Sequence, residues 1–298
     1  QPFFAYLSHK AVHAEFEPAE RHEGMYKDID IPKPQSMKNI EANYEGKPDW
    51  VREQRYSWHG VEHMYHGRDD HPQGIGEIIP RYSETLMGVD ESIDRVLDYL
   101  EEEGLAENTL VIYMGDNGFM LGEHGLIDKR QAYEESMRVP MLAWGPETIQ
   151  AGSTIEKNVL NIDLAPTFLD IAGGSMPEDH MVDGRSFLPL LEGKPVEWRS
   201  TFVYQYFWEN AFPHTPTTYA IRGDRYKYIY YHGVWDKNEL YDLKTDPDEM
   251  HNLIDAPEHQ EQIKKMHNEM FDIFEKNGAT DVRFRRPSTN QQDERIMH

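Results

Sequence analysis

Cysteine is absent from the 298 residues of this chain, and so is any long apolar run. Without cysteine the chain has no disulfide bond and no thiolate metal site. Without about eighteen consecutive apolar residues, no segment is expected to span a membrane. The chain also lacks a starting methionine and a signal peptide, and it begins almost inside an apolar stretch. That beginning is typical of a fragment.

Basic residues are scarce, because 30 lysines and arginines face 54 aspartates and glutamates, which gives a net charge of −24. Such a charge repels nucleic acid, so no nucleic-acid partner is expected. An anionic small substrate would need a local cluster of cations. Hydrophobic residues make up 38% of the chain, which is enough for a folded core. The length suits one large domain, alone or with a small one.

The stretch at residues 110–118 contains candidate metal-ligating side chains. Its apolar part predicts a buried strand at 109–114, and Asp116 and Asn117 follow directly. These side chains offer two hard oxygen ligands, whereas calcium takes six to eight, so other segments or the substrate would supply the rest. The Asn-Gly pair is also typical of a hairpin turn, but residues 119–125 do not alternate like a returning strand. The spacing does not fit an EF-hand.

Cationic groups follow this stretch. Lys129 is a compact charge suited to a tetrahedral anion, and His124 is able to hydrogen-bond the same anion. The alternative for Lys129 and Arg130 is a solvated pair in a loop.

The beginning of the chain suggests a second group of polar side chains. Residues 3–7 predict a short buried strand, and His9 and His13 follow it. Two histidines four apart share a face if the segment is helical, but the glutamate of the zincin pattern is absent. Two polar loop histidines are the alternative. Residues 15–80 are expected to be irregular. Four histidines in this segment are expected on the surface: His59, His63, His66 and His71.

Helical spacing of apolar residues predicts a helix at 81–103, and the strand at 109–114 follows it. A helix that leads into an apolar strand is half of a βαβ crossover, so a largely parallel sheet is expected. Ligands bind beyond the carboxyl ends of such strands, where both polar groups would meet. A further strand is expected at 139–144 and a helix at 164–172, with Asp163 as its N-cap.

The amino-acid composition changes near residue 195. Aromatic and β-branched residues predict an antiparallel meander with strands at 201–208, 218–221 and 226–231 and an edge strand at 238–243. An amphipathic helix with one apolar face follows, formed by Ile263, Met266, Met270, Ile273 and Phe274. Two parts are therefore expected, residues 1–195 and 196–298. The aromatic residues at 204–212, with His214, form either a carbohydrate-stacking wall or the core of the sheet.

Several of these stretches carry a family resemblance. Gly-Asp-Asn-Gly at 115–118, Leu-Gly-Glu-His-Gly-Leu at 121–126, Asp-Lys-Arg at 128–130 and Arg-Val-Pro at 138–140 resemble the type I sulfatases of the alkaline-phosphatase superfamily. Matching segments at 3–16, 161–167, 183–186, 220–228 and 239–247 extend the resemblance over nearly the whole chain. It implies an α/β fold with a mostly parallel, helix-flanked sheet and a small carboxy-terminal subdomain with an antiparallel sheet and a helix.

The resemblance also implies an activity, the hydrolysis of a sulfate ester with bound Ca²⁺. The loop at 122–133 is most similar to sulfatases that act on N-acetylglucosamine-6-sulfate, so the partner is expected to be a sulfated small molecule or glycan. A periplasmic or secreted location is implied as well. The implied roles are calcium ligands for Asp116 and Asn117, sulfate binding and catalysis for Lys129, general acid for His13, and substrate pocket for His9 and His124. His214 is a candidate for substrate binding through the aromatic stretch alone.

The family nucleophile is a formylglycine made in a Cys/Ser-x-Pro-Ser-Arg motif. The nearest candidate, at Ser175, lacks the Ser-Arg part and lies in the wrong place. The chain is therefore expected to be the carboxy-terminal portion of a sulfatase, inactive alone and in need of an amino-terminal segment or a second chain. A sheet without its first strands would expose apolar edges, which predicts poor solubility. A phosphate or phosphonate ester hydrolase and a non-catalytic sulfatase-like binding protein are the alternatives.

Overall fold

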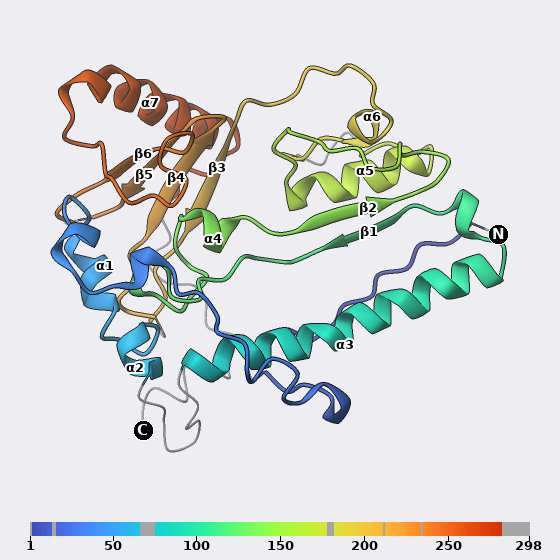
Figure 1. Ribbon diagram of the computed structural model, residues 1–298. Coiled ribbons are helices and arrows are strands. Elements are labelled where there is room, and N and C mark those ends of the chain that lie inside the picture. Colours follow the sequence, from blue (N-terminus) through green and yellow to red (C-terminus); the bar gives the residue numbers. More distant parts are fainter. Residues whose placement is uncertain are drawn as a thin grey trace.

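The computed structural model describes residues 2–13, 16–65, 75–177, 182–210, 212–233 and 235–281. Short helices lead into one long helix, a two-stranded ribbon, two further helices, and a four-stranded sheet covered by the last helix (Figure 1). The helices are α1 (Asp49–Gln54), α2 (Val61–Tyr65), α3 (Ile75–Glu102), α4 (Glu134–Met137), α5 (Leu164–Ile171), α6 (Leu188–Leu191) and α7 (Gln260–Lys276). The strands are β1 (Val111–Met114), β2 (Met141–Trp144), β3 (Thr201–Tyr206), β4 (Thr218–Gly223), β5 (Tyr226–Tyr231) and β6 (Glu239–Asp242). Within the described residues, no helix is long and apolar enough to cross a membrane.

The α/β class is confirmed, but the strands pair differently from the prediction. β1 and β2 run antiparallel, with Val111 opposite Trp144 and Met114 opposite Met141. Residues 115–140 connect them as a long loop with only short helical turns. Antiparallel neighbours need no crossover helix, which explains why a loop suffices here. In Figure 1 the ribbon lies between α3 on one side and α5 with α6 on the other.

The predicted buried strand at residues 3–7 is wrong. This segment is extended without strand pairing, and its apolar side chains are exposed, Phe4 at 70% and Tyr6 at 82%. Phe4 makes an edge-to-face contact with Phe168 of α5 at 5.2 Å between ring centroids. An apolar run becomes a strand only where a partner edge accepts its hydrogen bonds. Within the described residues, no strand pairs with this segment.

The predicted meander is confirmed, with the strand order β3-β4-β5-β6 and every neighbouring pair antiparallel. Alternate side chains pack on opposite faces, as the pleat requires. Ile221, Tyr228 and Leu240 pack against Met266, Met270 and Phe274 of α7. The opposite face packs on the earlier part of the chain through Ala220, Ile229, Tyr231 and Tyr241. Both faces of this sheet are therefore buried.

Residues 16–65 are more ordered than predicted, because their helices supply core residues. Trp50 and Val51 of α1 join the core on the inner face of the sheet, and the Trp50 ring meets the Tyr231 ring edge-to-face at 5.5 Å. His63 stacks on Trp58. His66 and His71 lie outside the described residues.

Asp163 is the residue directly before α5, but its side chain makes no hydrogen bond that caps α5. The buried carboxylate instead accepts bonds from the backbone N–H groups of Leu160 and Arg185, both at 2.8 Å, and pairs with the guanidinium of Arg199. The aspartate is therefore a buried acceptor that joins three segments.

Candidate active site

The site starts where β1 ends. Asp116 and Asn117 are exposed, and Asp116 Oδ1 accepts the N–H of Asn117 at 2.9 Å. Gly118 follows under a tight constraint, because a Cβ there would lie 2.1 Å from the carbonyl oxygen of Glu135. Its N–H donates to the Ser136 carbonyl at 3.0 Å. The glycine lets the backbone approach residues 135–136, and this approach fixes the two oxygen-bearing side chains at the strand end.

The chain then doubles back and brings Lys129 to Asn117. Met120 N–H donates to the Asp128 carbonyl at 2.7 Å, and Gly122 N–H donates to the Leu126 carbonyl at 2.9 Å. Fully buried Met120 and Leu126 anchor this returning segment in the core. As a result the Lys129 ammonium lies 3.2 Å from Asn117 Oδ1. Two of the predicted site residues, twelve apart in sequence, are thus in contact.

Asp128 holds in place the loop at residues 118–133, which contains Lys129 and which we call the lysine loop. Its carboxylate is only 1% exposed and accepts the N–H of Lys129 and the amide of Gln131, each at 2.8 Å, and the amide of Gln54 at 3.2 Å. It also pairs with the guanidinium of Arg130. Buried charge-assisted bonds of this kind are stronger than neutral ones, so the positions of Lys129 and Arg130 are well determined.

An aromatic and cationic wall stands beside this loop. The Arg130 guanidinium lies 3.3 Å from the centroid of the Phe212 ring. The His59 ring lies 5.0 Å from the same ring, and its Nδ1 is 3.9 Å from an oxygen of Asp128. Burial lowers the pKa of His59, the charge of Asp128 raises it, and Arg130 and, to a smaller extent, His214 lower it further. The exposed His214 therefore lies within electrostatic reach of the wall formed by Arg130, Phe212 and His59.

The other predicted histidines lie in different surroundings. His9 is exposed, and its Nε2 is 2.9 Å from Ser92 Oγ on α3. His13 is exposed in a turn closed by its N–H and the Lys10 carbonyl at 2.9 Å.

His124 is not a pocket residue in this structure. It is 1% exposed, its ring packs on Tyr133 at 4.2 Å between centroids, and neither ring nitrogen has a hydrogen-bond partner among the described residues. Burial, with the charges of Lys47 and Lys227, lowers its pKa well below the ordinary value. A positive φ of 54° turns this side chain inward, and neighbouring glycines at 122 and 125 share the left-handed backbone. The prediction that placed His124 in the pocket is therefore corrected.

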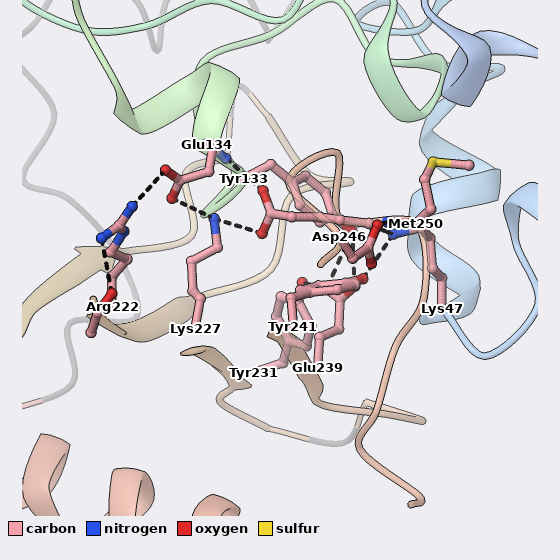
Figure 2. Close-up of polar contacts among 12 residues, drawn as sticks. Lys47, Tyr133, Glu134, Arg222, Lys227, Tyr231, Glu239, Tyr241, Asp246 and Met250 are labelled. Atoms are coloured by element: carbon pink, nitrogen blue, oxygen red, sulfur yellow. Dashed lines mark hydrogen bonds and ion pairs between the residues drawn. The ribbon is translucent and has the colours of Figure 1, made fainter. Parts of the chain in front are cut away.

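A buried ionic network fixes the far end of the loop to the carboxy-terminal sheet (Figure 2). The Lys227 ammonium on β5 lies 2.6 Å from Glu249 and 3.1 Å from Glu134, which directly follows the loop. Glu134 also pairs with Arg222 of β4 at 3.3 Å, and its N–H donates to Glu249 at 2.7 Å. Lys47 donates to the Glu249 carbonyl. Burial raises the pKa of Glu249 to about 7 and lowers that of Lys47.

Glu239 of β6 forms the second half of this network. Its carboxylate accepts the hydroxyls of Tyr133, Tyr231 and Tyr241, all of them buried. Burial, with the charge of Glu239, raises the pKa of each tyrosine well above the ordinary value, so all three stay protonated donors. Tyr133 thereby ties the loop to the sheet at a second point.

The sequence did not identify several residues of the site. His59 was expected on the surface, Gln54 carried no recognisable pattern, and Asp128 belonged to a matching motif but was given no role. His59 reaches the loop because Gly60 bridges Leu126 and the His59 carbonyl accepts the N–H of Ile127 at 2.8 Å. Asp128 and Arg130, on either side of Lys129, and Phe212, in the aromatic stretch, gave a sequence signal.

No described group of three or more histidines, cysteines, aspartates or glutamates could hold a metal ion. Asp116 and Asn117 nevertheless fit calcium in kind, since both present exposed oxygens. Two side chains supply only part of a six- to eight-oxygen shell.

Comparison with known proteins agrees with this geometry. The sulfatase profile matches residues 1–175, which is more than half of the chain, and the profile of the N-sulphoglucosamine sulphohydrolase C-terminal region matches residues 122–276. The chain belongs to the sulfatase family. The two profiles together cover the exposed strand end, the lysine loop and the carboxy-terminal sheet.

Two individual relatives show to which members of the sulfatase family this chain is similar in sequence. It is 32% identical to an N-acetylglucosamine-6-O-sulfatase of Bacteroides thetaiotaomicron over 89% of this chain and 56% of the relative. It is 30% identical to the multifunctional alkaline phosphatase superfamily protein PehA of Trinickia caryophylli over 86% of this chain and 52% of the relative. The chain spans about half the length of these curated relatives.

A solved structure is similar over most of the chain. It shows a protein in complex with its substrate D-glucosamine-2-N,6-O-disulfate, with a TM-score of 0.81 and 30% identity, and the match covers 91% of this chain and 65% of that one. The phosphonate monoester hydrolase of Silicibacter pomeroyi shares the fold, with a TM-score of 0.74 at 22% identity over 87% of this chain and 53% of that one.

Proposed function

We propose that this chain supplies part of the active site of a sulfatase that removes a sulfate ester from a sugar. The observation that carries the proposal is the contact of 3.2 Å between the Lys129 ammonium and Asn117 Oδ1, with exposed Asp116 beside it. Hard oxygen ligands next to a compact cation suit a divalent metal and a tetrahedral anion bound side by side.

Asp116 and Asn117 are the residues of this chain that would hold calcium. The ion, when bound, would neutralise charge on the sulfate oxygens. Lys129 would bind the same oxygens as a point charge, and its pairing with Asn117 keeps the ammonium at the metal side of the site. His13 is proposed to give a proton to the leaving sugar hydroxyl, and exposed His9 to line the pocket. No Cys/Ser-x-Pro-Ser-Arg motif occurs in the 298 residues, so no step is assigned to the formylglycine of the family.

The wall beside Lys129 is proposed to bind the sugar. Arg130 is held by Asp128 and stacks on Phe212, which presents a fixed guanidinium next to an apolar ring. Such a pair suits the hydroxyls and the C–H face of a pyranose. His214 extends the wall. The relatives named for 6-sulfated glucosamine support this substrate class. A Drosophila melanogaster relative named as an extracellular sulfatase homolog, 44% identical over 41% of this chain, supports a location outside the cytoplasm.

A phosphonate or phosphate ester is the second candidate substrate. Lys129 and the two oxygen ligands would hold either tetrahedral anion, and the likeness to the multifunctional protein PehA favours testing it. A third alternative is a protein that binds a sulfated ligand without hydrolysing it. The exposed oxygens of Asp116 and Asn117 beside Lys129 favour hydrolysis of an ester over binding alone.

The test uses the full-length protein that contains this chain. Its kcat/KM is measured on glucosamine-6-sulfate, an aryl sulfate and a phosphonate monoester. We expect the sulfated sugar to be preferred and Lys129→Ala to lower its kcat/KM by about a hundredfold or more, the usual cost of losing one charge-stabilising contact. Lys194→Ala is the matched control, since this exposed lysine pairs with Glu192 at the surface. Unchanged turnover in Lys129→Ala would refute the assignment, and a preference for the phosphonate would move the function to the second candidate.

A further inference from the structure

A hollow lined by tryptophans lies at one end of the carboxy-terminal sheet. It has a volume of about 210 Å³ and is lined by Trp208, Thr217, His232, Gly233 and Trp235. The pocket lies just beyond the paired row Tyr206, Thr218 and Tyr231, where β3, β4 and β5 lie side by side. We call this hollow the tryptophan pocket.

Hydrogen bonds hold the walls of the tryptophan pocket in place. Thr217 is the centre, because its hydroxyl accepts the N–H of Trp208 at 2.9 Å and its carbonyl accepts the N–H of His232 at 3.0 Å. The Trp208 indole N–H donates to the Pro213 carbonyl at 3.2 Å, and the Trp235 indole N–H donates to the His232 carbonyl at 3.1 Å. Both indoles therefore have their polar edges bonded to the protein.

Gly233 lines one side of the pocket. Its φ of +114° lies in the region that favours glycine, so a side chain here would be strained. A Cβ there would lie 3.5 Å from the Trp235 ring, which is an ordinary contact distance. Trp235 remains 39% exposed, so part of its ring is accessible to a ligand.

The chemistry of the pocket selects an uncharged ring. None of its five lining residues is a lysine, arginine, aspartate or glutamate. Aromatic walls with no cation have nothing to offset the desolvation of a sulfate, whereas they suit the C–H face of a pyranose. The volume is below the range of about 300–1,000 Å³ that is typical of drug-sized ligands, so one ring fits better than two.

One loop connects this pocket to the wall beside Lys129. Residues 208–217 begin with Trp208 and end with Thr217, and between them lie Phe212 and Thr215. Phe212 stacks under Arg130, and the Thr215 hydroxyl lies 3.4 Å from Gln54, which bonds to Asp128. The loop therefore contributes both of its ends to the tryptophan pocket, and Phe212 between them to the proposed sugar wall.

We propose that the tryptophan pocket binds an unsulfated sugar unit of a glycan whose sulfated unit occupies the site at Lys129. The inference rests on the proposed function, because the glycan is the substrate of that same site. The pocket would favour oligosaccharides over monosaccharides, since a second ring adds a stacking contact that a monosaccharide cannot make.

The test compares two substrates in the full-length protein, glucosamine-6-sulfate and a trisaccharide that carries the same 6-sulfated unit at one end. In Trp235→Ala the ratio of kcat/KM for the trisaccharide to that for the monosaccharide should fall about tenfold, which corresponds to about 1.4 kcal/mol. Trp235→Phe should restore part of the ratio. Tyr99→Ala, which removes an exposed aromatic ring from α3, should leave it unchanged. An equal loss on both substrates, or no loss, would overturn the proposal.

A binding measurement separates this proposal from the proposed function. An unsulfated N-acetylglucosamine trisaccharide is titrated into the full-length protein, and tryptophan fluorescence is followed. A saturable change that disappears in Trp235→Ala supports the pocket even where no sulfate ester is hydrolysed. Hydrolysis of the sulfated substrates without any saturable change would overturn the pocket and leave the proposed function intact.

Discussion

Replacing Glu249 by glutamine should change how the stability of this protein depends on pH. The carboxylate is fully buried, lies 2.6 Å from Lys227 and accepts the backbone N–H of Glu134. Burial raises its pKa from the ordinary 4.5 to about 7, although Lys227 acts in the opposite direction. Glutamine keeps the shape and the acceptor oxygen but cannot ionise.

The sign and size of the effect follow from this pKa. A carboxyl whose pKa is raised by folding contributes stability that is fully present below pH 4.5 and is lost as the pH rises to about 7. At about 1.4 kcal/mol per pKa unit, the wild type should lose about 2.5 kcal/mol of unfolding free energy between pH 5 and pH 8 through Glu249 alone. Glu249→Gln should not show this loss. Titrating groups that Glu249 does not influence, the buried His124 included, are common to both proteins and cancel in the comparison.

The assay is urea unfolding of both proteins at pH 5 and pH 8. The stability of the wild type relative to Glu249→Gln should be about 2.5 kcal/mol greater at pH 5 than at pH 8. Glu192→Gln, at a surface glutamate, is the control and should run parallel to the wild type. Parallel profiles for Glu249→Gln and the wild type would show that burial does not raise this pKa, and the reasoning would be refuted.

Two further predictions concern the core and the loop. Trp50→Ala should lower the unfolding free energy by about 3–5 kcal/mol in urea unfolding, because it leaves a cavity beside Tyr231; a loss below about 1 kcal/mol would contradict the packing. Asp128→Asn should lower kcat/KM for the sulfated sugar about tenfold or more, because the buried partner of Arg130 and of the Lys129 N–H loses its charge. Unchanged kinetics in a folded Asp128→Asn protein would mean that this carboxylate does not position the loop.

Regular elements were predictable where local periodicity decides them. The helix α3 and the meander β3–β6 follow from patterns of period 3.6 and 2, and α7 follows from its apolar face. The apolar run at residues 3–7 has a pattern suited to a strand too, but pairing depends on a neighbour that no local pattern contains. The antiparallel run of β1 and β2 was missed for the same reason, because direction is set by the path of the whole connection.

The candidate site was predictable in part. Asn117 and Lys129 share one loop, so their contact depends on bonds within about a dozen residues. His59 and Gln54 reach the site from more than sixty residues away, and no spacing rule connects them to Asp128. His124 was misplaced because its side-chain direction depends on a positive φ that the sequence does not reveal for a residue other than glycine. The division of the chain near residue 195 stays a prediction.

The sheet β3–β6 has a consequence for how this protein loses its structure. Its outer face packs on α7, and its inner face shares one core with Trp50, Met120 and Tyr133 from the first part of the chain. Removing either part would leave aromatic side chains and the carboxylates of the buried network facing water. The lysine loop, anchored in that same core, should therefore melt together with the sheet in one cooperative transition rather than open on its own.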